Sequence, residues 1–267
     1  MTPVRARASI PPERLSSLRD LIESASGVVL GDAKLPHLSA VVRGRMAALG
    51  IPDALRYVEF LSEEEGGAER RDRGSELLVG ETSFFRTPVL FQAFEKAILP
   101  GLLEQGFGSP LPIWCAGCAT GEEAYSVAIA ALEGSRGRHA VPVRVRATDL
   151  HPRFIDTARE GIYPAPALRN LPGRIQEMYF EQMKDGRHRV TDAVRRLVDF
   201  EERNLIDFLS DPLPSARYAA IFCRNVMIYF RSDTTRRLVE RFHASLFEGG
   251  VLFLGHSETL WGISEAF

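Results

Sequence analysis

Beyond about residue 75, apolar runs of strand length alternate with amphipathic stretches of helical length, and this alternation limits the possible folds more than any other feature. The pattern predicts strands at 111–115, 143–148, 218–223 and 251–254. Helices are expected at 122–132 and 232–246, and Gly249 and Gly250 would end the second of them. Such alternation is typical of βαβ units, in which helices cover a mostly parallel sheet. The sequence therefore predicts an α/β fold.

The first 65 residues carry a different pattern, in which apolar residues recur at helical spacing. Three helices are predicted, at 15–25, at 38–49 before Gly50, and from Pro52 onward with Leu55, Val58 and Leu61 on one face. Residues 66–74 are charged and nearly free of apolar side chains, which indicates an exposed linker. We therefore predict a helical domain at 1–65, a linker at 66–74 and an α/β domain at 75–267.

One stretch of the larger domain breaks the alternation. Gly186 separates the apolar residues 178–180 from the alternating residues 188–190, and residues 197–200 are again typical of a strand. Short strands around a glycine turn favour antiparallel pairing. We therefore predict a small antiparallel β insertion at about 172–203.

Composition excludes several classes of protein. The chain has 267 residues, of which 45% are hydrophobic and 25% charged, and its net charge of -2 gives no overall attraction for nucleic acid or an anionic membrane. No apolar run approaches the roughly 18 residues that span a bilayer, and the first residues lack the apolar centre of a secretory signal. Three cysteines imply no disulfide framework. We expect a cytoplasmic protein that neither binds nucleic acid nor inserts into a membrane.

The segment WCAGCATGEEAYS, residues 114–126, passes from a strand through a turn of small residues into a helix. Such a turn lets a ligand approach the backbone and the start of the helix. The dinucleotide fingerprint G-x-G-x-x-G is absent, and the helix opens with Glu122 and Glu123, which would repel a pyrophosphate. The acids suit a cationic ligand without phosphate, such as S-adenosylmethionine. A second explanation fits either glutamate equally well, because a negative charge in the first turn stabilises a helix through its dipole.

Asp149 directly follows the next predicted strand. A carboxylate at this place can accept both hydroxyls of a ribose, and an aspartate that caps the following helix fits the same position. Cys115 and Cys118 form a C-x-x-C pair, but no second pair completes a zinc site and the second cysteine does not open the helix. The sequence therefore predicts no metal site.

Five segments together resemble the CheR family of chemotaxis receptor methyltransferases. They are GETSFFR (80–86), WCAGCATGEEAYS (114–126), ATDLHPRFIDTAREGIYP (147–164), FCRNVMIYF (222–230) and LFLGHSE (252–258), in the order and spacing of the family. The resemblance runs from about residue 15 to the end of the chain. It implies a class I S-adenosylmethionine-dependent methyltransferase domain with a Rossmann-like sheet, an N-terminal helical domain and a three-stranded antiparallel insertion.

The resemblance also implies roles for individual residues. Arg86 and Tyr229 would face the reacting carboxylate, and the cofactor would be bound by Thr82, Arg86, Glu123, Asp149, Asn204, Leu205, Arg224 and Asn225. Within that set, Glu123 would meet the amino group of S-adenosylmethionine and Asp149 the ribose hydroxyls. The implied partner of this monomer is the helical cytoplasmic domain of a chemoreceptor, whose C-terminal peptide docks on the insertion in some family members. The products would be glutamate methyl esters and S-adenosylhomocysteine.

This chemistry explains why no histidine base stands out in the sequence. A glutamate side chain has a pKa near 4.3 and is already an anionic nucleophile at neutral pH. The enzyme then only has to position the carboxylate for an in-line approach to the methyl group. The arginine that orients the carboxylate must not bind it too tightly, because the charge of the carboxylate is lost in the transition state.

Two features depart from the family. Gly80 stands where the family usually has asparagine, so one contact to the cofactor would be missing. The family also places a final strand after residues 252–258, so we expect either a shortened chain or a continuation beyond Phe267. These departures keep a second hypothesis open, a non-catalytic module that binds S-adenosylmethionine or its product and signals through a partner. A third, an NAD-dependent dehydrogenase, is disfavoured by the missing glycine fingerprint.

Overall fold

A computed structural model describes residues 10–67, 69–70, 82–135, 143–212 and 217–267. The chain divides into two compact units, Met1–Val79 with Tyr229–Arg231, and Gly80–Ile228 with Ser232–Phe267. Most of the predicted linker at 66–74, and the departure at Gly80, lie outside the described residues. The predicted domain boundaries therefore stay a prediction.

The first unit contains the helices α1 (Pro12–Ser26), α2 (Leu35–Leu49) and α3 (Ala54–Ser62). Gly27 and Gly50 adopt the left-handed conformation that ends α1 and α2. The helices share a hydrophobic core made of Leu18, Ile22, Val28, Leu30, Leu38, Val42, Tyr57 and Leu61. The face expected for α3 is partly wrong, because Leu61 is buried as expected but Leu55 is 44% exposed, and the other buried residues are Ala54 and Tyr57.

The turn Tyr229–Arg231 is also part of the first unit. The carbonyl oxygen of Tyr229 accepts a hydrogen bond of 2.7 Å from the N–H of Val29. The Lys34 ammonium lies 5.1 Å from the centroid of the Tyr229 ring, and Arg231 forms an ion pair of 3.1 Å with Glu23. Tyr229 is thus placed by contacts far away in the sequence, which no local pattern indicates.

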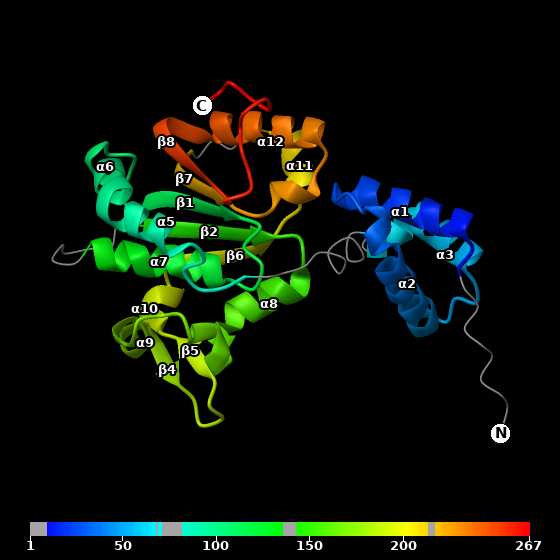
Figure 1. The fold of residues 1–267 in the computed structure, drawn as a ribbon, viewed down its shortest axis with the longest axis horizontal. Coiled ribbons are helices and arrows are strands. Elements are labelled where there is room, and N and C mark those ends of the chain that lie inside the picture. Colours follow the sequence, from blue (N-terminus) through cyan, green and yellow to red (C-terminus); the bar gives the residue numbers. More distant parts are fainter. Residues whose placement is uncertain (1–9, 68, 71–81, 136–142, 213–216) are drawn as a thin grey trace. The chain divides into compact units, whose positions relative to one another are not determined.

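The second unit is built on a five-stranded sheet of β1 (Leu111–Ala116), β2 (Val143–Asp149), β6 (Val198–Glu202), β7 (Tyr218–Cys223) and β8 (Leu246–Leu254) (Figure 1). The strand order is β6-β2-β1-β7-β8, and each neighbouring pair is parallel. The order reverses beside β1, whose neighbours are β2 on one side and β7 on the other. In sheets of this kind, ligands bind at the carboxyl ends of the strands at that reversal.

Helices cover both faces of this sheet. On one face, Ile113 and Cys115 belong to the large hydrophobic core. Residues of four helical segments pack in the same core: α5 (Pro88–Ala93), the π-helical segment Phe94–Ile98, α6 (Leu99–Glu104) and α7 (Glu122–Gly134). Trp114 points to the other face because side chains alternate along a strand. There it contacts Phe208 of α11 (Leu205–Ser210) and Phe242 of α12 (Ser232–Ser245), with ring centroids 4.9 and 5.4 Å away.

A small antiparallel sheet of β3 (Ile162–Tyr163), β4 (Phe180–Gln182) and β5 (His188–Val190) accompanies the main sheet, in the order β3-β5-β4 (Figure 1). Between these strands the chain forms α9 (Gly173–Tyr179), and α10 (Asp192–Arg195) follows them. An antiparallel insertion was expected, but its strands were partly misassigned. Residues 198–200 of the predicted strand belong to β6, which pairs with β2 of the main sheet. The third strand of the small sheet, β3, precedes the predicted start at 172.

A second correction concerns the end of α12. The helix ends at Ser245, and Leu246, Gly249 and Gly250 already belong to β8, which pairs with β7 through a register shift. The glycine pair therefore marks an irregularity in a strand. Within the described ranges, every helix is too short or too polar to span a lipid bilayer.

Candidate functional site

Two loops meet at the carboxyl ends of the central strands, one after β1 and one after β7. The β1 loop contains Gly117, where an added Cβ would lie 2.4 Å from the Cγ2 atom of Val226 in the β7 loop. Only glycine allows the two segments to approach so closely. The reversal of strand order therefore coincides with close backbone packing between the loops that carry the predicted site.

Backbone strain is concentrated around these loops. The described non-glycine residues with positive φ are Phe85 (52°), Thr87 (69°), Ala119 (46°) and Asn225 (58°). Ala119 and Asn225 lie in the two loops, and the segment 85–87 is hydrogen-bonded to Ser126 of α7, which follows the β1 loop, and to Arg224 at the start of the β7 loop. Strained backbone of this kind persists only where surrounding contacts impose it, and it gathers at functional sites.

Arg224 is the centre of the site. It directly follows β7, and its side chain is only 1% exposed. One guanidinium nitrogen donates a hydrogen bond of 2.8 Å to Oε2 of Glu123, and the other donates to the carbonyl oxygen of Arg86 at 2.9 Å and to Oγ1 of Thr87 at 3.0 Å. The guanidinium also lies 5.7 Å from the Phe91 ring centroid. Arg224 therefore joins the start of α7 to the 85–87 segment.

Glu123 belongs to the first turn of α7, and its side chain is 12% exposed. Burial raises the pKa of this carboxyl group, and Glu258 adds to the increase, whereas the positive charges of Arg224 and Arg86 lower it. A carboxylate can accept about four hydrogen bonds, and Arg224 supplies one of them. Glu123 is thus a buried acid suited to a cationic group such as an ammonium.

Asp149 ends β2, one strand away from the β1 loop. Its Oδ2 accepts a hydrogen bond of 2.8 Å from the N–H of Ala119, and its Oδ1 accepts one of 2.9 Å from the N–H of His151. Burial raises the pKa of Asp149, although these backbone donors lower it. Asp149 does not cap α8 (Pro152–Glu160), because that helix is capped by the side chain of His151. The capping alternative is therefore wrong.

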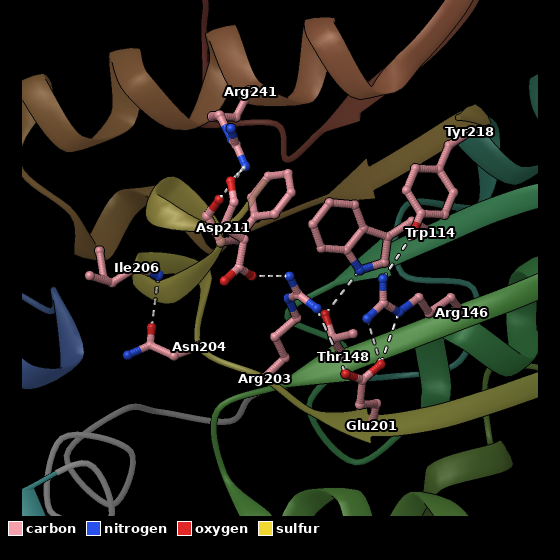
Figure 2. A network of polar contacts seen from close by, with 11 residues as sticks. Trp114, Arg146, Thr148, Glu201, Arg203, Asn204, Ile206, Asp211, Tyr218 and Arg241 are labelled. Carbon is pink, nitrogen blue, oxygen red and sulfur yellow. Dashed lines mark hydrogen bonds and ion pairs between the residues drawn. The ribbon is translucent and has the colours of Figure 1, made fainter. Parts of the chain in front are cut away.

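Asn204 and Leu205 follow β6 and are both buried. The Oδ1 of Asn204 accepts a hydrogen bond of 2.9 Å from the N–H of Ile206, which caps the short helix α11 (Figure 2). The N–H of the preceding residue, Arg203, donates to the carbonyl oxygen of Asp149 at 2.9 Å. The structure therefore connects Asn204 to Asp149 through the backbone, at the carboxyl ends of β6 and β2.

The residues of this edge fit an adenosylmethionine ligand. The Oδ1 of Asn225 is buried and has no hydrogen-bond partner in the described part of the chain. This oxygen can therefore accept a hydrogen bond from a ligand. Together with the carboxylates of Glu123 and Asp149, it provides acceptors for an ammonium, ribose hydroxyls and a base N–H. Thr82 and Arg86 are half-buried in the segment next to them. Tyr229 belongs to the other compact unit, so its predicted role stays a prediction.

Sequence reasoning missed several residues of the site. Ser126 of α7 accepts a hydrogen bond of 2.8 Å from the N–H of Phe85 and so holds the 85–87 segment. Thr87 contacts Arg224, and Glu258 accepts hydrogen bonds from the β7 loop. Glu258 and Ser126 each lie in a segment of the family resemblance, which was a signal, whereas Thr87 lies outside these segments and acts through a contact that no spacing in the sequence indicates.

The three cysteines are buried and are not accessible for reaction at the surface. Cys115, Cys118 and Cys223 are buried free thiols, and burial raises the pKa of each well above its ordinary value. No cluster of His, Cys, Asp or Glu within the described ranges could hold a metal ion. Buried thiols with raised pKa values are unreactive.

The parallel sheet, its reversal beside β1 and the acidic site define a nucleoside-binding α/β domain of the S-adenosylmethionine-dependent methyltransferase class. The family described as CheR methyltransferase, SAM binding domain, matches residues 80–267. The chain belongs to this CheR methyltransferase family. Its activity is that of an S-adenosylmethionine-dependent chemotaxis methyltransferase.

Relatives match almost the whole chain. The chemotaxis protein methyltransferase of Borreliella burgdorferi is 31% identical over 95% of this chain and 90% of its own length. Chemotaxis protein methyltransferase 1 of Vibrio cholerae is 34% identical over 92% of this chain and 89% of its own. Among solved structures, a glycopeptide N-methyltransferase complexed with S-adenosylmethionine covers 58% of this chain and 48% of its own, at 13% identity and a TM-score of 0.33. The family assignment depends on the sequence relatives.

Proposed function

We propose that this protein transfers the methyl group of S-adenosylmethionine to glutamate side chains in the cytoplasmic helical domain of a chemoreceptor. The products are glutamate methyl esters and S-adenosylhomocysteine. The observation that carries the proposal is the set of buried acceptors at the sheet reversal, in which Glu123 is paired with Arg224 and Asp149 receives two backbone N–H groups. These acceptors suit a ligand with an ammonium and a ribose and without phosphate.

In the proposed site, Glu123 binds the amino group of the cofactor, Asp149 binds the ribose hydroxyls, and Asn204, Leu205, Arg224 and Asn225 surround the adenosine side. Thr82 and Arg86 contact the methionine end. When bound, S-adenosylmethionine supplies an electrophilic methyl group on a sulfonium. The substrate carboxylate is already anionic at neutral pH, so the protein need not remove a proton.

Arg86 is proposed to orient the substrate carboxylate for an in-line approach. Its carbonyl oxygen is held by Arg224 and the N–H of its neighbour Phe85 by Ser126, so the backbone that carries the guanidinium is fixed on both sides. A fixed backbone lets the guanidinium orient the substrate carboxylate without tight binding, which suits a reaction in which the negative charge of the nucleophile disappears.

The proposal is tested by incubating the purified protein with radiolabelled S-adenosylmethionine and membranes that contain a chemoreceptor. We expect label on the receptor that base treatment releases, as for a methyl ester, and no label on receptor whose cytoplasmic glutamates are replaced by alanine. Cofactor binding without base-labile label would contradict the proposal and favour a non-catalytic signalling module. Calorimetry that finds binding of NAD but not of S-adenosylhomocysteine would favour a dehydrogenase.

Further properties follow from the family resemblance and belong to the same proposal. The protein acts as a cytoplasmic monomer, does not bind nucleic acid and does not insert into the membrane. In the receptor complex, the small sheet of β3, β5 and β4 is the proposed docking place of a receptor's C-terminal peptide. A binding measurement with that peptide, and with a receptor that lacks it, distinguishes this docking from recognition of the receptor helices alone.

A further inference from the structure

Glu258 has a set of contacts that the proposed reaction does not use. Its Oε2 accepts hydrogen bonds from the N–H groups of Asn225 at 2.8 Å and Gly255 at 2.7 Å. Its Oε1 accepts from the N–H groups of Val226 at 3.0 Å and Met227 at 2.8 Å. One carboxylate thus receives four backbone hydrogen bonds, three of them from successive residues of the β7 loop.

The three successive donors converge because of the backbone at Asn225. This residue has a φ of 58°, a conformation that L side chains rarely adopt. A left-handed residue in such a position turns neighbouring N–H groups toward one point and makes a concave anion-binding site, called a nest. In this protein the carboxylate of Glu258 occupies the nest. The carboxylate therefore stabilises the strained loop, and the strained loop supplies three of the hydrogen bonds that hold the carboxylate.

Gly255 leaves room for the same arrangement. A Cβ at this position would lie 2.7 Å from Oε2 of Glu258, 2.8 Å from Nδ2 of Asn225 and 2.9 Å from the backbone nitrogen of Asn225. Gly255 directly follows β8, which pairs with β7, so both ends of the contact come from neighbouring strands. The glycine and the glutamate of the segment 252–258 thus have one shared role, to hold the β7 loop.

We propose that Glu258 is a positioning residue of the cofactor site. It fixes the backbone of Asn225, Val226 and Met227, and through it the side chains at the start of the loop. Those are Arg224, which binds Glu123, and Asn225, whose buried Oδ1 is proposed to accept a hydrogen bond from the cofactor. Glu258 does so without contact to the cofactor. The inference rests on the proposed function, because the residues it positions are those assigned to S-adenosylmethionine.

The first test compares Glu258→Gln with the exposed Glu240→Gln as a control. An amide of the same size presents an NH₂ group to two of the four N–H donors, so the loop must shift. We expect the affinity for S-adenosylhomocysteine, measured by calorimetry on protein shown to be folded by circular dichroism, to fall about tenfold to a hundredfold. The KM for S-adenosylmethionine should rise by a similar factor, and Glu240→Gln should leave both unchanged.

The second test uses Glu258→Ala, which leaves the nest without its carboxylate. Added formate should refill it and recover part of the lost affinity, whereas sodium chloride of equal ionic strength should not. Formate should not restore Glu258→Gln, in which the side chain still fills the space.

Several outcomes would overturn the inference. They are unchanged affinity in the folded Gln variant, no recovery of the Ala variant by formate, or failure of both variants to fold, which would give Glu258 a role in the whole unit. Failure of the unmodified protein to bind S-adenosylhomocysteine would instead contradict the proposed function.

Discussion

Asp149 shows how one carboxylate serves both the fold and the proposed ligand. Burial raises its pKa and that of Glu123, so the folded protein binds protons at these groups more tightly than the unfolded chain does. Their contribution to stability is therefore present at low pH and is lost as the pH rises from the unfolded pKa through the raised one. Cofactor binding has the opposite dependence, because it needs both groups ionised.

We therefore predict that affinity for S-adenosylhomocysteine falls on acidification, beginning above the ordinary titration range of aspartate and glutamate. Asp149→Asn should lower the affinity at neutral pH by roughly tenfold to a hundredfold, because an amide presents its NH₂ group to one of the two backbone donors. It should also make the remaining pH dependence shallower. Calorimetry at several pH values measures both effects, with the exposed Asp233→Asn as control. An unchanged affinity at neutral pH would remove Asp149 from the site.

At the scale of elements, the junction between β1 and α7 depends on Gly121. This residue has a φ of 97°, and an added Cβ would lie 2.8 Å from Cβ of Ala158 and 3.0 Å from the hydroxyl of Tyr163. Gly121→Ala should lower the free energy of unfolding by about 1–3 kcal/mol through strain and overpacking. Gly173→Ala, where nothing lies within 4 Å of the new Cβ, is the matched control and should change stability little. Equal denaturation midpoints for both variants would contradict the role of Gly121.

A cluster of arginines holds the short helix α11, which carries Asn204 at its start (Figure 2). Arg241 of α12 donates hydrogen bonds to the carbonyl oxygens of Phe208, at 2.8 Å, and Asp211, and its guanidinium lies 4.9 Å from the Phe208 ring centroid. Arg203 pairs with the carboxylate of Asp211 from the other side. The two guanidinium groups thus hold the C-terminal end of α11, where positive charges interact favourably with the helix dipole.

Arg241→Met keeps an unbranched apolar stem but removes the guanidinium group that donates both hydrogen bonds. We predict a loss of about 1–3 kcal/mol in the free energy of unfolding, because the two carbonyl groups lose charged partners. Arg237→Met, at an exposed position of the same helix, should stay within about 0.5 kcal/mol of the unmodified protein. Urea denaturation followed by circular dichroism compares the two. The prediction is wrong if their midpoints coincide.

The sequence predicted elements well where a local pattern defines them. The apolar run at 218–223 is β7, and the helical spacing up to Gly50 is α2. It failed where the partner of a strand decides the assignment. Residues 197–200 look like any short strand, and only long-range pairing places them beside β2 instead of in the small sheet. The glycine pair 249–250 likewise predicts a helix end, although Leu246 of β8 already pairs with Tyr218 of β7.

At the scale of the whole molecule, the same limit applies to the site. Glu123 and Asp149 could be proposed from their places after strands, because parallel strands end at one edge. Thr82, Arg86, Asn204, Leu205, Arg224 and Asn225 came from the resemblance alone. The contact of Arg224 with Glu123 joins residues 101 positions apart, and Glu258 reaches the β7 loop across 31 to 33 positions. Such contacts have no local signature in composition or spacing.

The two compact units have separate hydrophobic cores, and this separation has a consequence for unfolding. The first core contains Leu38 and Tyr57, and the larger core of the second unit contains Phe94 and Phe222. Separate cores predict two thermal transitions, and a ligand that binds only the second unit should raise only one of them. At a concentration of about 100 times its Kd, S-adenosylhomocysteine should stabilise that unit by roughly 2.7 kcal/mol.

Scanning calorimetry with and without S-adenosylhomocysteine measures this effect, and a variant assigns the transitions. Leu38→Ala removes a fully buried side chain from the first core. It should lower the free energy of unfolding of the first unit by about 2–5 kcal/mol, and with it the midpoint temperature of that unit's transition. The ligand should then act on one transition and the substitution on the other. A single transition that responds to both would mean that the two units unfold together, and it would contradict the prediction.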